Sequence, residues 1–170
     1  MDTQVVIIGG GPSGLLLSQV LNRAGIATVV LERSSRAHVL SRIRAGVLEW
    51  GSVELLREAG IGARMDAQGL PHDGTYLTDG DRMVHIDFKA LTGRRVMIYG
   101  QTEVTEDLYA AQDAMGTTVL HGVEDVVIED LDAAQASVSF TVEGARRTLT
   151  CAYVAGCAGF HGVSRKTIPE

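Results

Sequence analysis

The N-terminal part of the chain alternates between short apolar runs and an amphipathic stretch. Residues 3–8 and 27–32 are rich in β-branched apolar side chains, which is typical of strands buried on both faces of a parallel sheet. A helix is predicted from about Ser13 because apolar side chains then recur at helical spacing. These side chains are Leu17, Val20, Leu21 and Ala24. Gly25 follows as the expected terminator, so the pattern predicts a βαβ unit with a right-handed crossover.

The middle of the chain predicts a second group of elements after a polar, arginine-rich loop. A helix is expected over about 47–59, and Gly60 is placed to end it. Its expected apolar side chains are Leu48, Leu55, Leu56 and Ala59. Residues 61–94 are expected to be irregular, apart from short strands near 75–78 and 83–88.

A strand is predicted over 95–100, and a further helix follows it. Thr102 can cap this helix, and Glu103 lies in the first turn, where the helix dipole favours an acid. The apolar side chains of the helix are Val104, Leu108, Ala111 and Met115. Gly116 is expected to end it.

The C-terminal part changes its pattern twice. Residues 117–121 predict another short parallel strand, whereas apolar and polar side chains alternate within 123–150, which indicates an antiparallel meander with one solvated face. Residues 153–159 return to the parallel type. The predicted fold class is α/β, with a Rossmann-like parallel sheet, a βαβ dinucleotide-binding unit and an inserted β-meander. All of residues 1–170 are assigned to this one domain.

Composition narrows the class of protein. The chain has 170 residues, 45% of them apolar, and a net charge of −6, which argues against a nucleic-acid partner because such a partner needs a concentrated basic face. No stretch approaches the ~20 apolar residues of a membrane span, and the N-terminus lacks the basic region of a signal peptide. A cytoplasmic location is therefore expected. Cys151 and Cys157 have no metal-site or disulfide spacing and are expected to be reduced and buried.

The segment "GGGPSG" carries the first candidate chemistry. Gly9, Gly11 and Gly14 have G-x-G-x-x-G spacing between a predicted strand and a predicted helix, where backbone amides can face a pyrophosphate. Glu32 ends the second predicted strand and is placed to accept hydrogen bonds from ribose hydroxyls. Its carboxylate disfavours a 2′-phosphate in this site. The motif thus predicts a site for NAD or for the ADP half of FAD and does not choose between them.

Arginines follow this unit. Arg42 and Arg44 alternate in an extended segment before a predicted helix. Two guanidinium groups near a pyrophosphate would offset its charge and form bidentate hydrogen bonds. A solvated basic loop is the alternative interpretation.

Longer strings support a more specific assignment. The segments "VVIIGGGPSGLLL", "RIRAGVLE", "YGQTEVTEDL" and "AGCAGFHGVSR" resemble the N-terminal part of the 4-hydroxybenzoate 3-monooxygenase family, which are FAD-dependent aromatic hydroxylases. The resemblance covers the whole chain. It implies that residues 1–170 are the first part of a glutathione-reductase-like FAD-binding domain, with the substrate domain and a second flavin motif outside this chain.

The resemblance implies roles for matched positions. Ser13 would contact the FAD pyrophosphate, Glu32 the adenosine ribose, and Gln101 the cofactor through its side chain. Arg44 would contact the FAD phosphates. His72 would end a relay that carries the phenolic proton of the substrate to solvent. The loop implied to lie along the flavin comprises Arg42, Ile43, Arg44, Ala45, Gly46 and Val47.

The family also implies a nicotinamide donor. Arg33 counts among the cofactor-binding residues, and the segment that it begins would meet the adenosine end of that donor. Arg33, Arg36 and His38 are possible partners of a 2′-phosphate, which favours NADPH over NADH. The remaining histidines are expected to be structural. They are His85, His121 and His161.

The implied reaction uses FAD, NAD(P)H and O₂ to convert 4-hydroxybenzoate to 3,4-dihydroxybenzoate, in an enzyme that is expected to be a homodimer. The 170-residue chain alone is expected to be inactive. A free-standing FAD- or NAD-binding module and a hydroxylase of another phenol remain alternatives. Ala158 stands where the family has an aspartate, whereas Gly156, Gly159 and Gly162 still allow close approach of the backbone.

Overall fold

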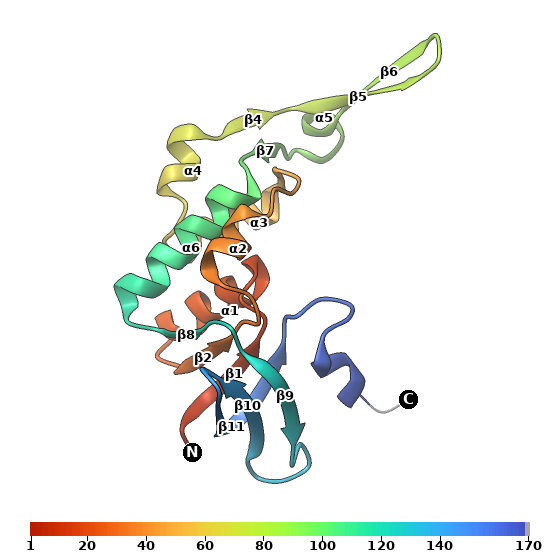
Figure 1. Cartoon of the computed structure of the whole chain (residues 1–170). Helices are drawn as coiled ribbons and strands as arrows, with labels where there is room; N and C mark the ends of the chain where they lie inside the picture. The colour runs from red at the N-terminus through yellow and green to blue at the C-terminus, as the bar shows by residue number, and fades with distance from the viewer. Residues whose placement is uncertain (169–170) are drawn as a thin grey trace. The chain divides into compact units, whose positions relative to one another are not determined.

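The computed structural model describes residues 1–168 of the chain (Figure 1). Contacts between Cα atoms divide the chain into two compact units. The first unit contains Met1–Arg42 and the chain from Thr105 onward, and the second contains Ile43–Val104. The assignment of the whole chain to one domain stays a prediction.

The first unit is built on a six-stranded mixed sheet with the order β8-β2-β1-β11-β10-β9. Strands β8, β2, β1 and β11 are parallel, and β10 and β9 continue the sheet in antiparallel fashion. The strands are β1 (Thr3–Ile8), β2 (Thr28–Leu31), β8 (Thr118–Leu120), β9 (Glu124–Glu129), β10 (Ala136–Val142) and β11 (Ala145–Gly156). The predicted α/β class, with its βαβ unit and β-meander, is therefore confirmed.

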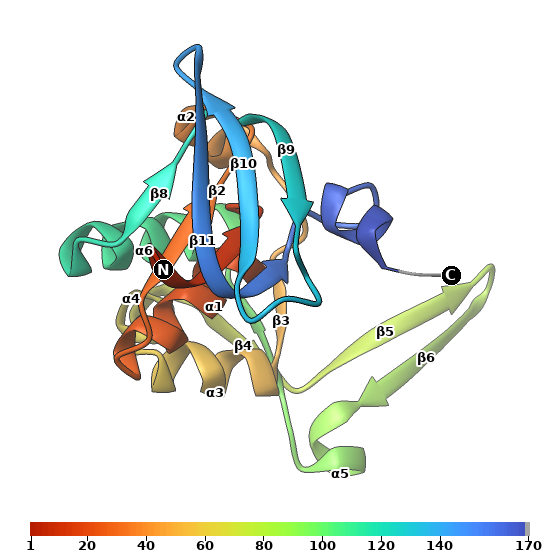
Figure 2. The same ribbon diagram turned by 90° about the horizontal axis from the view of Figure 1, so that it is seen from below.

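Strand β11 differs from the prediction in its length. The last strand of the meander and the last parallel strand are one continuous element, which Figure 2 shows as a long strand beside β10. Its first half pairs with β10 from Ala145 to Cys151, and its second half pairs with β1 from Cys151 to Gly156. No glycine or proline separates the two halves, so nothing in the sequence ends the strand between them.

The parallel part of this sheet is apolar on both faces. On one face Val5, Ile7 and Val30 are buried, with Leu17 and Leu21 of the first helix packed against them. The other face has a larger cluster, which alternating residues of β10 extend into the meander. Its buried members are Val6, Ile8, Leu31, Val123, Ala136, Val138, Phe140, Val142 and Cys151. Burial on both faces explains why the parallel strands are continuous apolar runs.

The first helix, α1 (Pro12–Arg23), follows the first strand as predicted, and Gly25 lies just beyond its end with φ of 76°. The predicted apolar stripe is partly wrong, because Val20 is exposed whereas Ser18 and Gln19 are buried. These two polar side chains face α6 (Gln101–Met115).

A buried polar network joins α1 to α6. The Ser18 hydroxyl donates to Gln112 Oε1 at 2.8 Å and lies 2.7 Å from Thr28 Oγ1. Gln112 Nε2 donates to the Leu15 carbonyl at 3.3 Å and to Gln19 Oε1 at 3.2 Å. Because every buried polar group needs a partner, this network replaces the apolar contact that helical spacing predicted.

Two expectations about helix starts need correction. Thr102 is not a cap but lies inside α6, because the carbonyl of Gly100 already accepts from the Val104 amide at 3.1 Å. The arginine-rich loop contains a short helix, α2 (Arg36–Ser41), which Ser35 caps by accepting from the His38 amide at 3.2 Å. A 3₁₀ helix, η1 (Val163–Thr167), follows β11.

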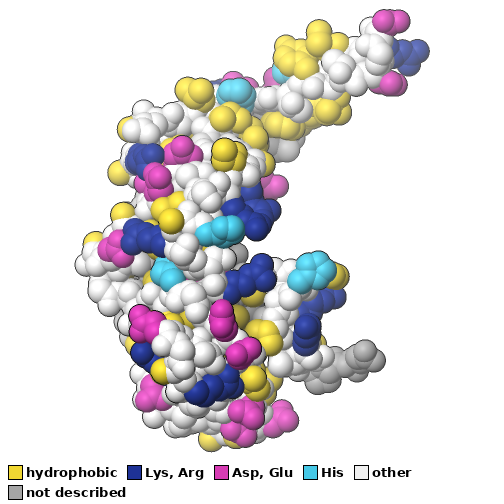
Figure 3. Space-filling view, viewed as in Figure 1, with side chains coloured by type: hydrophobic (Ala, Val, Ile, Leu, Met, Phe, Trp, Pro, Cys, Tyr) yellow, Lys and Arg dark blue, Asp and Glu magenta, His cyan; other side chains and the backbone are white. Residues whose placement is uncertain are grey.

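The second unit has a three-stranded antiparallel sheet with the order β3-β7-β4. Its elements are β3 (Val47–Glu49), α3 (Trp50–Glu58), α4 (Ala63–Gln68), β4 (Leu70–His72), β5 (Gly74–Asp79), β6 (Arg82–Asp87), α5 (Phe88–Thr92) and β7 (Val96–Ile98). Strands β5 and β6 form a hairpin, and Figure 3 shows hydrophobic side chains on its surface. Tyr76, Leu77, Met83 and Val84 of this hairpin are exposed.

The helix predicted from Val47 was wrong in its first turn. Residues 47–49 form a strand instead, because they pair with β7 and because the Tyr99 amide donates to the Gly46 carbonyl at 2.8 Å. The helix begins only at Trp50, and Gly60 ends it with φ of 78°. The region from 61 to 94 is more regular than expected, since it contains α4, β4 and α5 besides the two predicted strands.

Candidate functional site: the glycine loop at the ends of β1 and β11

The three glycines of the motif differ in what a side chain at each position would contact. Gly9 has φ of 114°, and a Cβ there would lie 2.5 Å from the carbonyl oxygen of Cys157. A Cβ on Gly14 would overlap the carbonyl oxygen of Gly9, so Gly14 lets helix and strand approach closely. A Cβ on Gly11 would meet no described protein atom within 4 Å. Gly11 is therefore not required by the packing of the chain itself.

The space beside Gly11 lies at the N-terminus of α1. Gly11 is the N-cap residue, Pro12 is the first helical residue, and no side chain caps this end. Ser13 is exposed there, and the first turn contains no acid. A helix N-terminus carries partial positive charge and free amide donors, which suit a phosphate. The residues present therefore fit the pyrophosphate of a dinucleotide.

Glu32 lies directly beside this loop. Its Oε2 accepts from the Gly10 amide at 2.7 Å, and its Oε1 accepts from the Ser34 amide at 2.8 Å. A carboxylate has about four acceptor positions, so two remain for ribose hydroxyls. Gly10 is a residue that the sequence analysis missed. A Cβ on Gly10 would lie only 2.8 Å from Glu32 Cβ. Glycine at position 10 is thus what allows Glu32 to reach the loop.

Tyr109 of α6 is a second residue that the sequence analysis missed. Its side chain is buried, and its hydroxyl donates to the Gly10 carbonyl at 3.2 Å. Burial, with the negative charge of Glu32, raises the pKa of Tyr109 to about 12. The phenol therefore stays protonated at neutral pH and can donate. The one sequence signal for the burial of Tyr109 is that it lies next to Leu108, which belongs to the apolar side of the predicted helix. Nothing in the sequence indicated that Tyr109 contacts the glycine loop.

The turn after β11 touches the same loop. The Cys157 amide donates to the Ile8 carbonyl at 2.7 Å, and Gly9 packs against the Cys157 carbonyl. Burial raises the pKa of the Cys157 thiol, which is half-buried, and that of the Cys151 thiol, which is fully buried. The predicted burial is confirmed for Cys151 and is wrong for Cys157, which is only half-buried.

Glycines also shape this turn. A Cβ on Gly156 would overlap Ser164 Oγ, and a Cβ on Gly162 would lie 2.7 Å from Ala158 Cβ. Gly159 has φ of 74°. Ala158 itself is exposed, so its side chain is not fixed by a core contact. Arg165 lies over the ring of Phe160 at 4.4 Å.

The structure brings together one part of the predicted site. Gly9, Gly11, Ser13, Gly14 and Glu32 form one loop region of the first unit. Two of the predicted arginines also belong to that unit, and both are exposed.

These two arginines are Arg33 and Arg42. Arg33 lies two residues after β2, and Arg42 is the C-cap residue of α2, with its Nε 3.3 Å from His38 Nε2. Their roles toward phosphate groups stay predictions.

The remaining predicted residues belong to the second unit. Ile43, Arg44 and Ala45 are exposed before β3. His72 is exposed and ends β4, opposite Val96.

Three further positions complete the set. Val47 is exposed in β3, and Gln101 is the first residue of α6. A Cβ on Gly46 would lie 2.9 Å from Gly100 Cα. Glycine at position 46 therefore lets the residue before β3 lie against the segment after β7. The roles of these residues toward a cofactor stay predictions.

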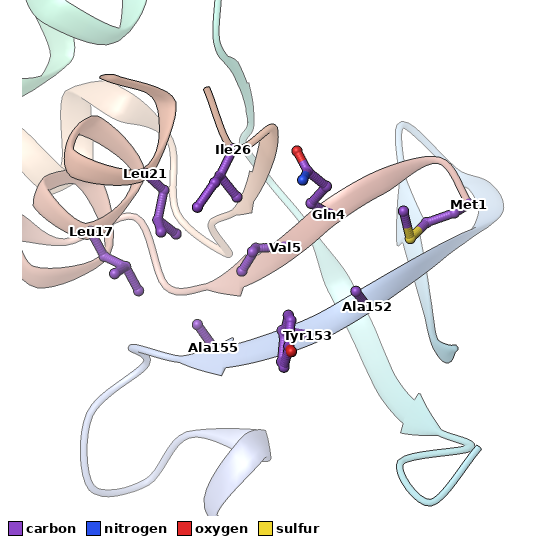
Figure 4. A pocket seen from close by; sticks show the side chains of 9 residues that line it. All are labelled: Met1, Gln4, Val5, Leu17, Leu21, Ile26, Ala152, Tyr153 and Ala155. Atoms are coloured by element: carbon purple, nitrogen blue, oxygen red, sulfur yellow. The ribbon is translucent and has the colours of Figure 1, made fainter. Parts of the chain in front are cut away.

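A separate apolar pocket lies on the α1 side of the sheet. Its volume is about 440 Å³, and Figure 4 shows Leu17, Leu21 and Ile26 facing Tyr153 and Ala155 of β11. Gln4 and Tyr153 are its polar lining residues. The pocket contains none of the glycine-loop residues and is not part of the dinucleotide site.

Within residues 1–168, no three His, Cys, Asp or Glu side chains come close enough together to hold a metal ion. No helix in that same range has the length and apolar character needed to span a membrane.

Fold and site together define a dinucleotide-binding protein of the Rossmann-like class. The sequence pattern of the FAD binding domain family matches residues 2–170. The chain therefore belongs to the FAD binding domain family. This result decides the alternative that the glycine motif left open in favour of FAD.

Two relatives of the chain support this family assignment. The chain is 44% identical over 171 aligned residues to a p-hydroxybenzoate hydroxylase of Acinetobacter baylyi, covering 100% of this chain and 42% of that protein. It is 27% identical to a pentachlorophenol 4-monooxygenase of Sphingobium chlorophenolicum, covering 98% of this chain and 32% of that protein. The predicted resemblance to FAD-dependent aromatic hydroxylases is confirmed.

A solved structure confirms the fold. The structure of an anhydrotetracycline hydroxylase from Streptomyces rimosus matches with a TM-score of 0.83 and 30% identity. It covers 98% of this chain, which corresponds to 33% of that protein. The chain thus spans about two-fifths or less of the length of these relatives.

Proposed function

We propose that this chain is the N-terminal FAD-binding part of an enzyme that hydroxylates 4-hydroxybenzoate to 3,4-dihydroxybenzoate. The observation that carries the proposal is 44% identity over the whole chain to a p-hydroxybenzoate hydroxylase. In this reaction NAD(P)H and O₂ are consumed, one oxygen atom enters the ring, and the other leaves as water. FAD supplies the redox chemistry when bound, and the protein supplies binding and orientation.

The residues of the glycine loop have proposed roles toward the ADP half of FAD. The amides at the start of α1, with Ser13, receive the pyrophosphate, and Glu32 accepts hydrogen bonds from the ribose. The open side of Gly11 supports this assignment, as do the acceptor positions left on Glu32. Arg44 and Gln101 are also proposed to contact the cofactor.

His72 is proposed to pass the phenolic proton of the substrate to solvent. Its exposure supports this role, because the last group of such a relay must reach water. An imidazole is suited to the task because it can both accept and release a proton. NADPH is proposed as the donor, with Arg33, Arg36 and His38 near its 2′-phosphate. The enzyme is further proposed to be a cytoplasmic homodimer.

The test uses the full-length protein that contains this chain. It should be isolated with bound FAD and should oxidise NAD(P)H faster when 4-hydroxybenzoate is added, with 3,4-dihydroxybenzoate as the product by chromatography. NADPH and NADH are compared at equal concentration. Binding of FAD without oxidation in response to any phenol would show a binding module instead of a hydroxylase.

A second candidate is a hydroxylase of another phenol. The relationship to pentachlorophenol 4-monooxygenase favours testing it, because a common FAD-binding part serves a different phenol there. A panel of substituted phenols separates the two. Oxidation driven by another phenol and not by 4-hydroxybenzoate would favour this second candidate. The 170-residue chain alone is expected to form no hydroxylated product with either.

A further inference from the structure

Two side chains fix the backbone at Gly10, one from α6 and one from the residue that follows β2. Its amide donates to Glu32 Oε2 at 2.7 Å, and its carbonyl accepts from the Tyr109 hydroxyl at 3.2 Å. The peptide groups on both sides of Gly10 are therefore fixed. Tyr109 is 99 positions away in sequence, so the contact is tertiary and not a property of the loop itself.

A second chain of contacts fixes the other side of Glu32. Its Oε1 accepts from the Ser34 amide at 2.8 Å, and the Ser34 carbonyl lies 3.0 Å from His121 Nδ1. A carbonyl can only accept, so Nδ1 of His121 carries the proton. His121 is half-buried and its ring lies 5.6 Å from that of Tyr109. The two chains of contacts thus converge on neighbouring rings.

The Tyr109 ring is held on a further side by α2. The guanidinium of Arg36 lies 4.5 Å from the centre of the ring, and its Nη1 contacts Asp113 Oδ2 at 2.8 Å. Asp113 lies on α6, one turn after Tyr109. An arginine over an aromatic face is attracted by its quadrupole. The hydroxyl therefore has little freedom to leave the Gly10 carbonyl.

We propose that Tyr109 and His121 are positioning residues of the dinucleotide site, which hold Gly10 and Glu32 in the geometry that receives the adenosine ribose and the pyrophosphate of FAD. This proposal rests on the assignment of the glycine loop and Glu32 to the ADP half of FAD. Each carboxylate oxygen of Glu32 accepts one hydrogen bond from a backbone amide. The remaining positions keep a fixed direction only while Gly10 and Ser34 are held.

The same arrangement explains why the two residues act at a distance. Neither residue needs to touch the cofactor, because Tyr109 acts through Gly10 and His121 acts through Ser34. Loss of either contact would let the carboxylate move and would raise the entropic cost of binding. The expected effect is on the adenosine half of FAD.

The test measures binding of FAD and of ADP to the apo form of the full-length protein by calorimetry. Tyr109→Phe keeps the ring and removes the hydroxyl, and it should raise both dissociation constants about two- to twelve-fold, as expected for one neutral hydrogen bond. Tyr153→Phe is the matched control, because that side chain is exposed and lies outside the loop. The affinity for FMN should not change in either variant.

A cycle with Glu32→Ala shows whether Tyr109 acts through the carboxylate. In that background Tyr109→Phe should have a clearly smaller effect, since interacting residues are not additive. His121→Asn keeps a donor near Nδ1 and should bind ADP better than His121→Ala. This pair also tests the proposal if Tyr109→Phe folds poorly.

Two results would overturn the proposal. One is a lower melting temperature of apo Tyr109→Phe with ADP and FAD affinities equal to those of Tyr153→Phe, which would mean a structural role alone. The other is an equal loss with and without Glu32. Hydroxylase activity is not part of the test, so a failure of the proposed reaction with intact ADP binding would leave this inference standing.

Discussion

Replacement of Gly11 and of Gly14 by alanine should separate ligand binding from folding within one motif. A Cβ on Gly11 would meet no described atom within 4 Å, and its φ of −79° suits alanine. We expect Gly11→Ala to change the free energy of unfolding of the apo protein by less than about 0.5 kcal/mol. Because the new methyl group points into the space proposed for the pyrophosphate, FAD binding should weaken at least about tenfold, equal to about 1.4 kcal/mol.

Gly14→Ala should do the opposite. Its Cβ would overlap the Gly9 carbonyl oxygen and would lie 3.3 Å from Cys157 Cβ, so α1 must move away from β1. Overpacking of this kind costs about 1–3 kcal/mol or more, which corresponds to a fall in melting temperature of about 2–4 °C for each kcal/mol in a domain of this size.

The assay for both variants is thermal and denaturant unfolding of the apo protein, followed by titration with FAD. Gly51→Ala serves as a control, because a Cβ there also meets nothing within 4 Å but lies in α3, outside the motif. The reasoning is refuted if Gly11→Ala destabilises the apo protein as much as Gly14→Ala does, or if it binds FAD with unchanged affinity.

Three further predictions follow from other contacts. Gln112→Leu removes three buried hydrogen bonds and should lower the free energy of unfolding by about 3 kcal/mol in denaturant titrations, whereas the exposed Gln135→Leu should not; equal values would contradict the role of the network. The pKa of Tyr109 is raised to about 12 in the folded state and is about 10 in the unfolded state. Its contribution to the free energy of unfolding is therefore complete below about pH 10 and is lost as the pH rises to about 12. The free energy of unfolding of Tyr109→Phe should depend less on pH in that window. Ala158→Asp should strengthen dinucleotide binding in the full-length protein, and equal affinities by calorimetry would exclude that effect.

The βαβ unit and the loop residues were predictable because their signals are local. Glycine spacing, β-branched runs and the acid at the end of the second strand are all read within a short window, and the structure places Gly9, Gly14 and Glu32 together accordingly. The resemblance to a family extended this reading to FAD, which the local motif could not distinguish from NAD.

The missed features depend on partners distant in sequence. Ser18 is buried because Gln112 lies across from it, 94 positions away, and helical spacing contains no information on that partner. Val47 is in a strand because it pairs with Ile98, which outweighs a local helical pattern. Tyr109 contributes to the loop only through a contact across 99 positions. In each case tertiary contacts decided the outcome.

The shared strand β11 has a consequence for the order of folding. Thr3 of β1 pairs with Cys151, and Asp2 Oδ2 accepts from the Thr150 amide at 2.7 Å, across 148 positions. During synthesis, the first strand is therefore made long before its central neighbour exists. Contacts of such high separation slow folding because loop closure must precede them. One edge of β1 therefore stays unpaired during synthesis until the residues up to Gly156 have left the ribosome.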